Sequence, residues 1–208
     1  MERTMGFWDR HAEGYARRPV ADEASYQRKL EVTRAYLRPG MRVLELGCGT
    51  GSTALVHAPY VEHILATDVS PKMLDIARAK AEAAGAGNVT FEQVTIEALR
   101  MPDHSFDVVL GLSILHLLRD KEAAIAKVFR MLEPGGLFVT STVCLGDTMK
   151  WFRIVGPVGR ALGLLPYLSV FTVAELADSL RAAGFEIDHQ WQPRRGKAVF
   201  IVAKKPGA

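Results

Sequence analysis

Three closely spaced glycines stand where an apolar run ends. Residues 43–51 read VLELGCGTG, so Gly47, Gly49 and Gly51 follow an expected strand and precede an expected helix. Glycine lets the backbone turn sharply and lets a ligand approach the main chain without a Cβ in the way. The N-terminus of the following helix offers unpaired N–H groups to an anionic group. The pattern favours a ligand-binding loop over a tight turn that binds nothing.

Two carboxylates accompany this loop. Glu45 lies directly before it, and Asp68 ends the next apolar run, about 20 residues further on. A carboxylate at that second position can accept hydrogen bonds from both hydroxyls of a ribose. The succession of strand, loop, helix, strand and terminal acid therefore indicates a nucleoside-containing ligand.

Two ligands of this kind fit such a loop: a dinucleotide and S-adenosylmethionine. Dinucleotide-binding loops usually have the spacing GxGxxG, whereas this loop has GxGxG. Glu45 would also repel a pyrophosphate, but it suits a ligand that carries an ammonium and a sulfonium. The residues therefore favour S-adenosylmethionine. A nucleotide-cofactor (NAD-type) oxidoreductase remains the alternative, as does a non-catalytic cofactor-binding partner subunit.

Apolar runs and helical patterns alternate along most of the chain. Strands are expected at 41–46, 63–68, 88–94, 106–112 and 137–142, and helices at 52–60, 71–84, 121–132 and 173–183. Ser70 and Thr172 are the expected N-caps of two of these helices. A turn at Pro134, Gly135 and Gly136 ends the helix before it. The last two runs, 185–192 and 198–205, predict an antiparallel hairpin. This alternation predicts an α/β fold of parallel β-α-β units.

In these motifs the sequence closely resembles the class I S-adenosylmethionine-dependent methyltransferases. The matching stretches are the glycine motif at 45–51, ATDVS around Asp68, FDVVLGLSILHLL and LEPGGLFVTST, within residues 36–145. Within that family the chain looks most like the group related to ubiquinone/menaquinone biosynthesis and phospholipid N-methylation. The resemblance implies a Rossmann-like, seven-stranded, mostly parallel sheet with helices on both faces and an antiparallel C-terminal hairpin strand. It also implies transfer of a methyl group by in-line displacement.

The resemblance implies a set of cofactor-binding residues. They are Tyr15, Glu45, Gly47, Cys48, Gly49, Gly51, Asp68, Val69, Met73, Thr95, Ile96, Leu112 and Ser113. Family members often place an Asp after the third strand, where it binds the adenine amino group. This chain has Thr95 there, whose hydroxyl can accept the same hydrogen bond.

The implied roles follow the length of the cofactor. Glu45, Gly47 and Gly49 line its methionine portion, which Tyr15 closes over, and Asp68 holds the ribose. Val69 and Met73 pack on the adenine, while Leu112 and Ser113 border the sulfonium.

A general base is needed only if the acceptor must lose a proton. His116, just after the run at 106–112, is the best candidate, and His11 is a poorer one. The structural alternative is a histidine that packs the start of the next helix. Cys48 inside the loop fits the turn as a small residue better than it fits a nucleophile. No metal site is suggested.

Two segments fall outside the alternating pattern. Residues 1–37 predict an N-terminal helical cap, and residues 146–171 form an insertion rich in apolar residues. We interpret the insertion as a hydrophobic lid, with a lipid contact or a dimer contact as alternatives. With the aromatic residues of the cap, it predicts a pocket for a small, lipophilic or aromatic acceptor. These aromatic residues are Phe7, Trp8, Tyr15 and Tyr26.

The bulk composition limits the other possibilities. Hydrophobic residues make up 49% of the 208 residues, which is ordinary for one globular domain spanning 1–208. A net charge of +3 gives no support for binding to nucleic acid. Two cysteines without metal or disulfide spacing favour a cytoplasmic location. The chain has no apolar run long enough to span a membrane, although peripheral membrane contact stays open. Both a monomer and a homodimer are compatible with the sequence.

Overall fold

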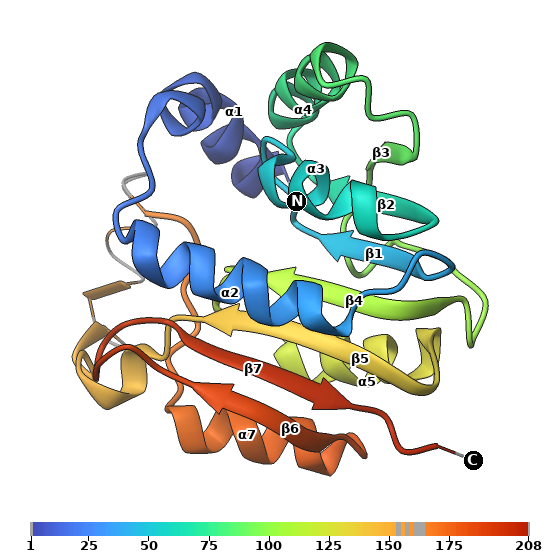
Figure 1. The fold of residues 1–208 in the computed structure, drawn as a ribbon. Helices are drawn as coiled ribbons and strands as arrows, with labels where there is room; N and C mark the ends of the chain where they lie inside the picture. The colour runs from blue at the N-terminus through green and yellow to red at the C-terminus, as the bar shows by residue number, and fades with distance from the viewer. Residues whose placement is uncertain (1, 153–154, 157–158, 160–164, 208) are drawn as a thin grey trace. The chain divides into compact units, whose positions relative to one another are not determined.

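The computed structural model describes residues 2–152, 155–156, 159 and 165–207 (Figure 1). The chain divides into two compact units, Met1–Arg100 and Met101–Ala208. Within the predicted insertion at 146–171, residues 153–154, 157–158 and 160–164 lie outside the described residues.

The first unit contains a three-stranded parallel arrangement with its helices. Its elements are α1 (Glu2–Arg17), α2 (Glu23–Tyr36), β1 (Arg42–Leu46), α3 (Ser52–His57), a 3-10 turn (Ala58–Tyr60), β2 (His63–Asp68), α4 (Pro71–Ala83) and β3 (Val89–Gln93). The interior positions of β1 and β2 are buried, as apolar runs covered on both faces should be.

The register of these strands brings their carboxyl ends to one edge. Leu46 of β1 pairs with Thr67 of β2, and Asp68 pairs with Gln93 of β3. The glycine loop after β1 and the acid at the end of β2 are therefore neighbours. Open α/β sheets bind their ligands at this edge.

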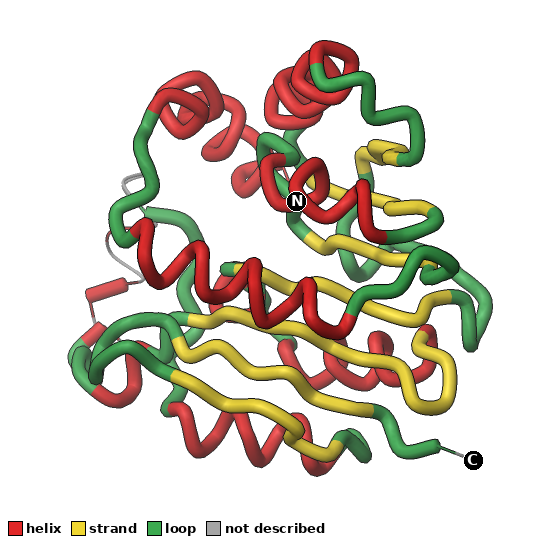
Figure 2. The backbone as a smooth tube through the Cα atoms, in the orientation of Figure 1, coloured by secondary structure: helices red, strands yellow, loops and turns green. Residues whose placement is uncertain are grey.

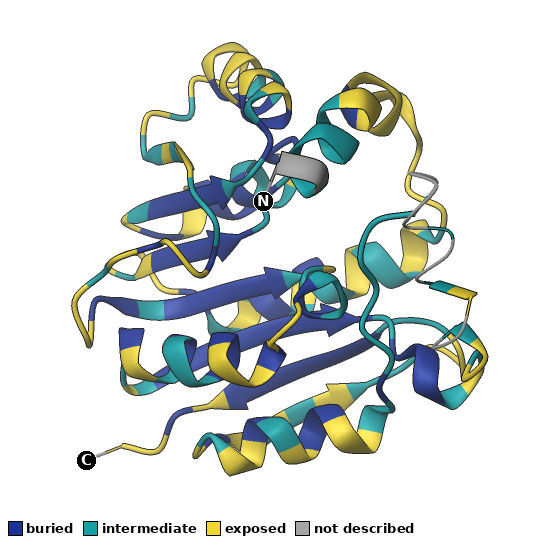
Figure 3. Cartoon of the chain, turned by 180° about the vertical axis from the view of Figure 1, so that it is seen from behind, coloured by how far each residue is buried: buried dark blue, intermediate teal, exposed yellow. Residues whose placement is uncertain are grey.

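The second unit combines parallel and antiparallel pairing. Its elements are β4 (Phe106–Leu112), a 3-10 turn (Leu115–Leu117), α5 (Lys121–Met131), β5 (Leu132–Thr142), a 3-10 turn (Leu145–Asp147), α7 (Val173–Ala182), β6 (Glu186–Trp191) and β7 (Val199–Lys204). β4 and β5 are parallel, whereas β7 runs antiparallel to both β5 and β6. Strands β4, β5 and β7 are largely buried, whereas β6 has no buried residue and the outward helix faces are exposed (Figure 3).

The strand order is β3-β2-β1-β4-β5-β7-β6, of which the first three belong to the first unit and the last four to the second. Figure 2 shows the strands of each unit together with the helices of that unit. The predicted α/β class, the mostly parallel seven-stranded sheet and the antiparallel C-terminal hairpin are confirmed. The expected N-caps are also confirmed: Ser70 accepts from the Met73 N–H, and Thr172 forms a capping box with Glu175.

The predicted turn between α5 and the following strand is wrong in detail. β5 already begins at Leu132, which pairs with Phe106, and the register shifts before Val108 pairs with Leu137. Residues 133–136, between these two pairings, form an irregularity in β5, where the N–H of Gly135 donates to the Lys205 carbonyl. Pairing with β4 and with the end of the chain supplies hydrogen bonds that the local sequence cannot reveal.

The predicted N-terminal helical region is confirmed as two helices. The chain leaves helical geometry between Arg17 and Glu23, and Asp22 caps α2 by accepting from the Ser25 N–H. This break allows α1 and α2 to take different directions.

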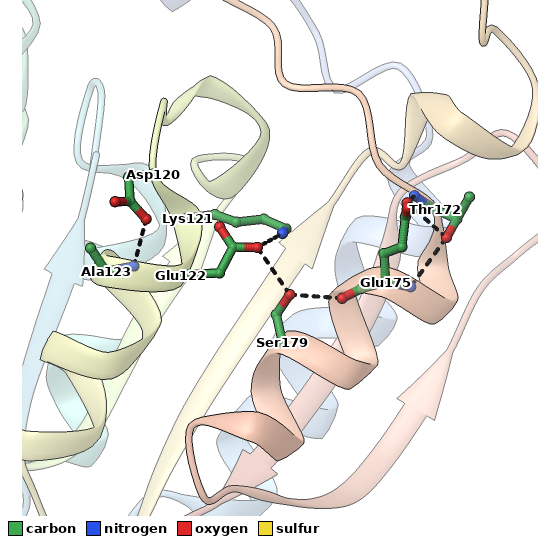
Figure 4. Close-up of polar contacts among 7 residues, drawn as sticks. All are labelled: Asp120, Lys121, Glu122, Ala123, Thr172, Glu175 and Ser179. Atoms are coloured by element: carbon green, nitrogen blue, oxygen red, sulfur yellow. Dashed lines mark hydrogen bonds and ion pairs between the residues drawn. The ribbon is translucent and has the colours of Figure 1, made fainter.

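Polar contacts join α5 to α7 in the second unit (Figure 4). Asp120 caps α5 through the Ala123 N–H, and Lys121 pairs with Glu122. The Ser179 hydroxyl of α7 donates to the Glu122 carboxylate at 3.3 Å. The bond between Ser179 and Glu122 thus joins the two helices, while the other contacts order the start of α5. Within the described residues, no helix is long and apolar enough to cross a membrane.

Candidate active site

The glycine loop adopts a backbone that ordinary residues avoid. Gly47, Gly49 and Gly51 all have positive φ, at 67°, 54° and 73°. A Cβ at Gly51 would lie 2.8 Å from the Cβ of Ala77 and 3.1 Å from the ring of Phe91. Gly51 is therefore required twice, for its conformation and for the packing of α4 and β3 against the loop.

Asp68 is tied to this loop by backbone hydrogen bonds. Its Oδ2 accepts from the Gly49 N–H and its Oδ1 from the Ser70 N–H, both at 2.9 Å. A carboxylate has about four lone-pair sites, so Asp68 retains acceptor capacity for further hydroxyls. Burial raises the pKa of Asp68, and its backbone hydrogen bonds oppose that change.

Glu45 is a buried carboxyl at the end of β1, with 3% of its surface exposed. It accepts a hydrogen bond from the Ala54 backbone in the first turn of α3. Its Oε2 has no partner among the described residues. Burial, and then the charge of Asp68, raise the pKa of Glu45 to about 8. An unpartnered buried oxygen beside a second carboxylate fits a cationic ligand. A positive charge there would offset both the burial of the Glu45 carboxylate and its repulsion by Asp68.

Two tyrosines complete the surroundings of these acids. The ring of Tyr15, at the end of α1, lies 3.8 Å from the position of a Cβ at Gly49. Burial, Asp68 and Glu45 raise the pKa of the Tyr15 phenol, in that order. Tyr26 of α2 hydrogen-bonds Thr53, and burial also raises its pKa.

Tyr26 was placed by the sequence only among the aromatic residues of an acceptor pocket. In the structure the charge of Glu45 contributes to raising the pKa of the Tyr26 phenol. The residue therefore lies on the acidic side of the candidate site. No sequence signal marks this position, because Tyr26 and Glu45 belong to elements that meet only in the folded unit.

Helix α1 reaches across the carboxyl edge of the first unit. The Ser70 hydroxyl donates to the Asp9 carboxylate at 2.5 Å, and the Gln93 amide approaches the Met5 sulfur at 3.7 Å. Asp9 also contributes to raising the pKa of Asp68. Sequence reasoning did not single out Asp9, whose partners are distant along the chain.

The residues expected around the adenine lie at the same edge. Met73 is buried, Val69 is half-buried, and the Val69 carbonyl accepts from the Gln93 amide at 3.3 Å. The Thr95 hydroxyl accepts from the Ala98 N–H at 3.1 Å, so it closes the turn after β3. Because a hydroxyl has two lone pairs, this bond leaves Thr95 one further acceptor position. Ile96 is buried beside it.

Cys48 is a poor nucleophile in this setting. Its side chain is buried, and its thiol lies 3.7 Å from the Gly49 carbonyl. Burial, followed by the charges of Glu45 and Asp68, raises the pKa of the thiol above its usual range. The thiolate is therefore strongly disfavoured, which supports the interpretation of Cys48 as a small residue that fits the turn.

Three of the predicted residues belong to the second unit. Leu112 ends β4, and Ser113 follows with a positive φ of 59°, its N–H donating to the Ser141 carbonyl at 2.7 Å. A non-glycine residue in this conformation carries strain and is worth attention near a site. Ser113 thus orients the chain that leaves β4.

His116 lies in the 3-10 turn after β4. Its Nδ1 is buried and has no hydrogen-bond partner in the part of the chain that the structure describes. Burial lowers the pKa of His116 to about 4, so the imidazole is neutral at physiological pH. The alternative His11 binds the Phe7 carbonyl of its own helix at 2.7 Å and is exposed. His116 is therefore the better placed of the two to accept a proton.

Comparison with known proteins places the chain in a family. A family profile described as a methyltransferase domain matches residues 43–136. The ubiquinone biosynthesis O-methyltransferase of Sinorhizobium fredii is 30% identical over 186 residues, which cover 80% of this chain and 74% of that protein. The chain belongs to the class I S-adenosylmethionine-dependent methyltransferases.

Other relatives of this methyltransferase share part of their length with it. The uncharacterized methyltransferase YcgJ of Bacillus subtilis is 36% identical over 110 residues, which cover 53% of this chain and 44% of that protein. The chain thus spans less than half of YcgJ in this match. A solved S-adenosylmethionine-dependent methyltransferase of Mesorhizobium loti has a TM-score of 0.69 at 24% identity, covering 85% of this chain and 95% of its own. That likeness concerns the fold.

Family membership does not favour the alternative of an NAD-type oxidoreductase. The predicted cofactor-binding residues of this methyltransferase divide between its units. Of the thirteen predicted residues, Leu112 and Ser113 lie in the second unit and the other eleven lie in the first. The structure brings Tyr15, Glu45 and Asp68 together around the glycine loop.

Proposed function

We propose that this protein transfers a methyl group from S-adenosylmethionine to a small, lipophilic or aromatic acceptor. The observation that carries the proposal is the buried, unpartnered oxygen of Glu45 beside Asp68 and Tyr15. The two carboxyls concentrate negative potential at the glycine loop, where a cation would be stabilised. A pyrophosphate would instead be repelled there.

The residues of the first unit would hold the cofactor. Glu45, Gly47 and Gly49 would line its methionine portion, Tyr15 would close over it, and Asp68 would bind the ribose. When bound, S-adenosylmethionine supplies a methyl group on a positively charged sulfur that an acceptor atom displaces in line. The protein's task is to orient the acceptor on that axis and to keep water away.

The remaining cofactor contacts belong to the same proposal. Val69, Met73 and Ile96 would pack on the adenine, and the Thr95 hydroxyl would accept from its amino group. From the second unit, Leu112 and Ser113 would border the sulfonium, and Cys48 and Gly51 would shape the loop.

His116 is proposed as the base for an acceptor that loses a proton. Its neutral imidazole and unpartnered Nδ1 support this role. The lipophilic acceptor is supported by the aromatic pair Phe7–Trp8 in the helical cap. The name of the Sinorhizobium fredii relative, an O-methyltransferase, points the same way.

The domain organisation of the proposal follows the sequence. Residues 1–208 would form one methyltransferase domain, with a helical cap at 1–37 and a lid at 146–171. Two free, buried cysteines support a cytoplasmic location. A small-molecule acceptor would make nucleic acid unnecessary as a partner, and the chain would act as a monomer or a homodimer.

Calorimetry with S-adenosylmethionine, S-adenosylhomocysteine and NAD tests the cofactor. We expect the first two to bind and NAD not to bind. Asp68→Ala should weaken cofactor binding at least tenfold, because hydrogen bonds from hydroxyls to a charged carboxylate are worth about 1.5–3 kcal/mol. Glu62→Ala, an exposed acid between the same strands, serves as the control. Binding of NAD alone would overturn the assignment.

A methylation screen tests the acceptor. Quinols, phenols, amines and lipids are incubated with the protein and isotope-labelled S-adenosylmethionine, and the label is followed into organic extracts. We expect a phenol or quinol to be labelled. Labelling confined to protein or nucleic acid would contradict the small lipophilic acceptor while leaving the cofactor assignment intact.

A further inference from the structure

The segment after β5 exposes apolar side chains in the second unit. Trp151 is 56% exposed and Val155 is 41% exposed, the former being the most exposed large apolar side chain among the described residues. Helical-turn hydrogen bonds order this stretch, including that from the Val155 N–H to the Trp151 carbonyl at 3.3 Å. Phe152 is half-buried, and its ring is tilted against that of Trp151, with ring centroids 5.1 Å apart. Trp151 is therefore exposed beside a half-buried aromatic neighbour.

The tip of the β6–β7 hairpin lies against the start of this segment. The Arg195 guanidinium donates to the Asp147 carbonyl at 2.9 Å, and a Cβ at Gly196 would lie 3.3 Å from Thr148. Figure 1 shows the connection between β6 and β7 beside the chain that follows β5. The exposed apolar side chains and the hairpin tip therefore share one end of the second unit.

This end is basic. Arg194 and Arg195 are exposed, Lys197 is half-buried, and Lys150 directly precedes Trp151. Within the described residues, Lys150, Arg194 and Lys197 take part in no ion pair. The carboxylate of Asp147, at the start of this segment, accepts from the Val173 N–H at 2.9 Å.

The turn that contains His116, the candidate base, lies at the same end of the second unit. Thr142, the last residue of β5, pairs with Val199, so the hairpin tip lies at the carboxyl edge of β5. Leu112 at the end of β4 pairs with Ser141, which puts the turn bearing His116 at this edge too. The Ser169 N–H also donates to the His116 carbonyl at 2.8 Å. The residues that return from the insertion thus contact the turn of the candidate base.

We propose that this surface, formed by Trp151, Val155, Lys150 and the basic hairpin tip at 194–197, docks on an anionic lipid bilayer. Tryptophan favours the membrane–water interface, where its ring is buried and its N–H stays hydrated. Basic side chains around it are attracted by anionic headgroups. An exposed aromatic anchor with basic neighbours is the arrangement that reversible binding at such an interface needs.

Docking at this edge deepens the proposed function. A lipophilic acceptor dissolved in the bilayer would meet the turn of His116 without crossing water. Delivery of an acceptor from the bilayer rests on the proposed function, whereas the docking itself rests on the surface of the second unit alone.

Co-sedimentation with vesicles tests the docking without cofactor or acceptor. One set of vesicles contains phosphatidylcholine only, and the other has a third of it replaced by phosphatidylglycerol. We expect binding to the second set, at least tenfold stronger than to the first, with a loss on adding salt. Equal binding to both sets, or binding to neither, would overturn the proposal.

Two variants and two controls locate the surface. In the basic variant, Lys150→Gln, Arg194→Gln and Lys197→Gln are combined, and Arg195 is kept because it holds the hairpin. Because each basic residue contributes about a fivefold gain in affinity for an anionic surface, the three substitutions together should weaken vesicle binding on the order of 100-fold. Its control combines three exposed basic residues elsewhere, Lys72→Gln, Arg130→Gln and Lys204→Gln, and should lose less than tenfold.

Trp151→Ser is the apolar variant, with Val20→Ser in the first unit as its control. We expect Trp151→Ser to weaken vesicle binding about tenfold, on the scale of a lost apolar side chain at an interface, and Val20→Ser to leave it unchanged. Circular dichroism verifies that both fold. If the Trp151 and basic variants bind vesicles like the unaltered protein, or if the protein binds heparin but no vesicle, the docking surface is wrong. Methyl transfer to a water-soluble acceptor would be unaffected by either result, so this proposal and the proposed function fail separately.

Discussion

Replacing Glu45 by Gln changes one oxygen of a buried carboxyl into an amide and removes its ability to ionise. The carboxyl is 3% exposed, faces Asp68, Tyr15 and Tyr26, and has one unpartnered oxygen. Its contact with the Ala54 backbone is preserved, because the amide oxygen still accepts. The substitution should therefore stabilise the protein without cofactor and weaken the binding of a cationic cofactor.

The size of the effect follows from the displaced pKa. Folding raises the pKa of Glu45 from 4.5 to about 8. Below pH 4.5 the folded and unfolded chains both keep the proton, and the contribution of Glu45 to stability is fully present. Between pH 4.5 and 8 the unfolded chain releases the proton first, so the free energy of unfolding falls as the pH rises. At about 1.36 kcal/mol per pH unit, the loss reaches about 5 kcal/mol by pH 8 and about 3 kcal/mol at pH 7.

Urea unfolding of the cofactor-free protein, followed at several pH values from 4.5 to 9, measures this difference. The unaltered protein and Glu45→Gln should have similar stabilities near pH 4.5. The variant should become progressively more stable toward pH 8. Glu62→Gln, an exposed acid before β2, is the control and should follow the unaltered protein. Calorimetry at pH 8 should show at least a tenfold loss of S-adenosylmethionine affinity for Glu45→Gln, since the attraction of a full charge is gone.

Parallel pH profiles would refute this reasoning. If the stability difference between Glu45→Gln and the unaltered protein were the same at pH 5 and pH 8, the carboxyl would ionise as it does in the unfolded chain. If the variant bound S-adenosylmethionine with unchanged affinity, Glu45 would not be part of a cation site, whatever its effect on stability.

Four further outcomes follow from the structure. Gly51→Ala should cost about 2–4 kcal/mol in urea unfolding, because a Cβ at positive φ would meet Ala77 at 2.8 Å; a cost below about 1 kcal/mol would contradict the packing. Lys205→Met should lower the free energy of unfolding in urea by about 2–3 kcal/mol. The buried Lys205 ammonium donates to the carbonyls of Phe129 and Leu132, at 2.9 and 2.7 Å, and the substitution leaves both without this donor. Burial lowers the pKa of His57 to about 4, so the free energy of unfolding should fall by about 3 kcal/mol as the pH drops from 6.5 to 4. His57→Gln should remove this fall. Unfolding free energies that change with pH in parallel for the variant and the unaltered protein would speak against it. His116→Ala should reduce turnover of a proton-bearing acceptor at least 100-fold and spare cofactor binding in calorimetry, and an unchanged rate would remove His116 from the mechanism.

The periodic elements of this protein were predictable because their signals are local. The strands at His63–Asp68 and Phe106–Leu112 coincide with the apolar runs. The caps at Ser70 and Thr172 depend on residues within one helical turn. The start of β5 at Leu132 was not predictable, because its first pairings depend on Phe106 and on the end of the chain.

Part of the candidate site was also visible in the sequence. A glycine loop with Glu45 before it and Asp68 after it has a spacing that any strand–helix–strand unit brings to one edge. Asp9 and Tyr26 stand at no recognisable sequence spacing from the glycine loop, so the sequence did not mark them. Their contacts with Ser70 and Thr53 exist only because α1 and α2 pack on the elements that follow them.

The sequence by itself determined the order of strands and helices, the glycine loop and the identity of its two acids, since these depend on residue type and short-range spacing. Only the tertiary structure decided the charge state of those acids. Whether Glu45 keeps its proton depends on how deeply it is buried and on its approach to Asp68, and both arise from β1 and β2 lying side by side. The grouping of Trp151 with the basic hairpin tip was decided in the same way, by the pairing of β5 with β7.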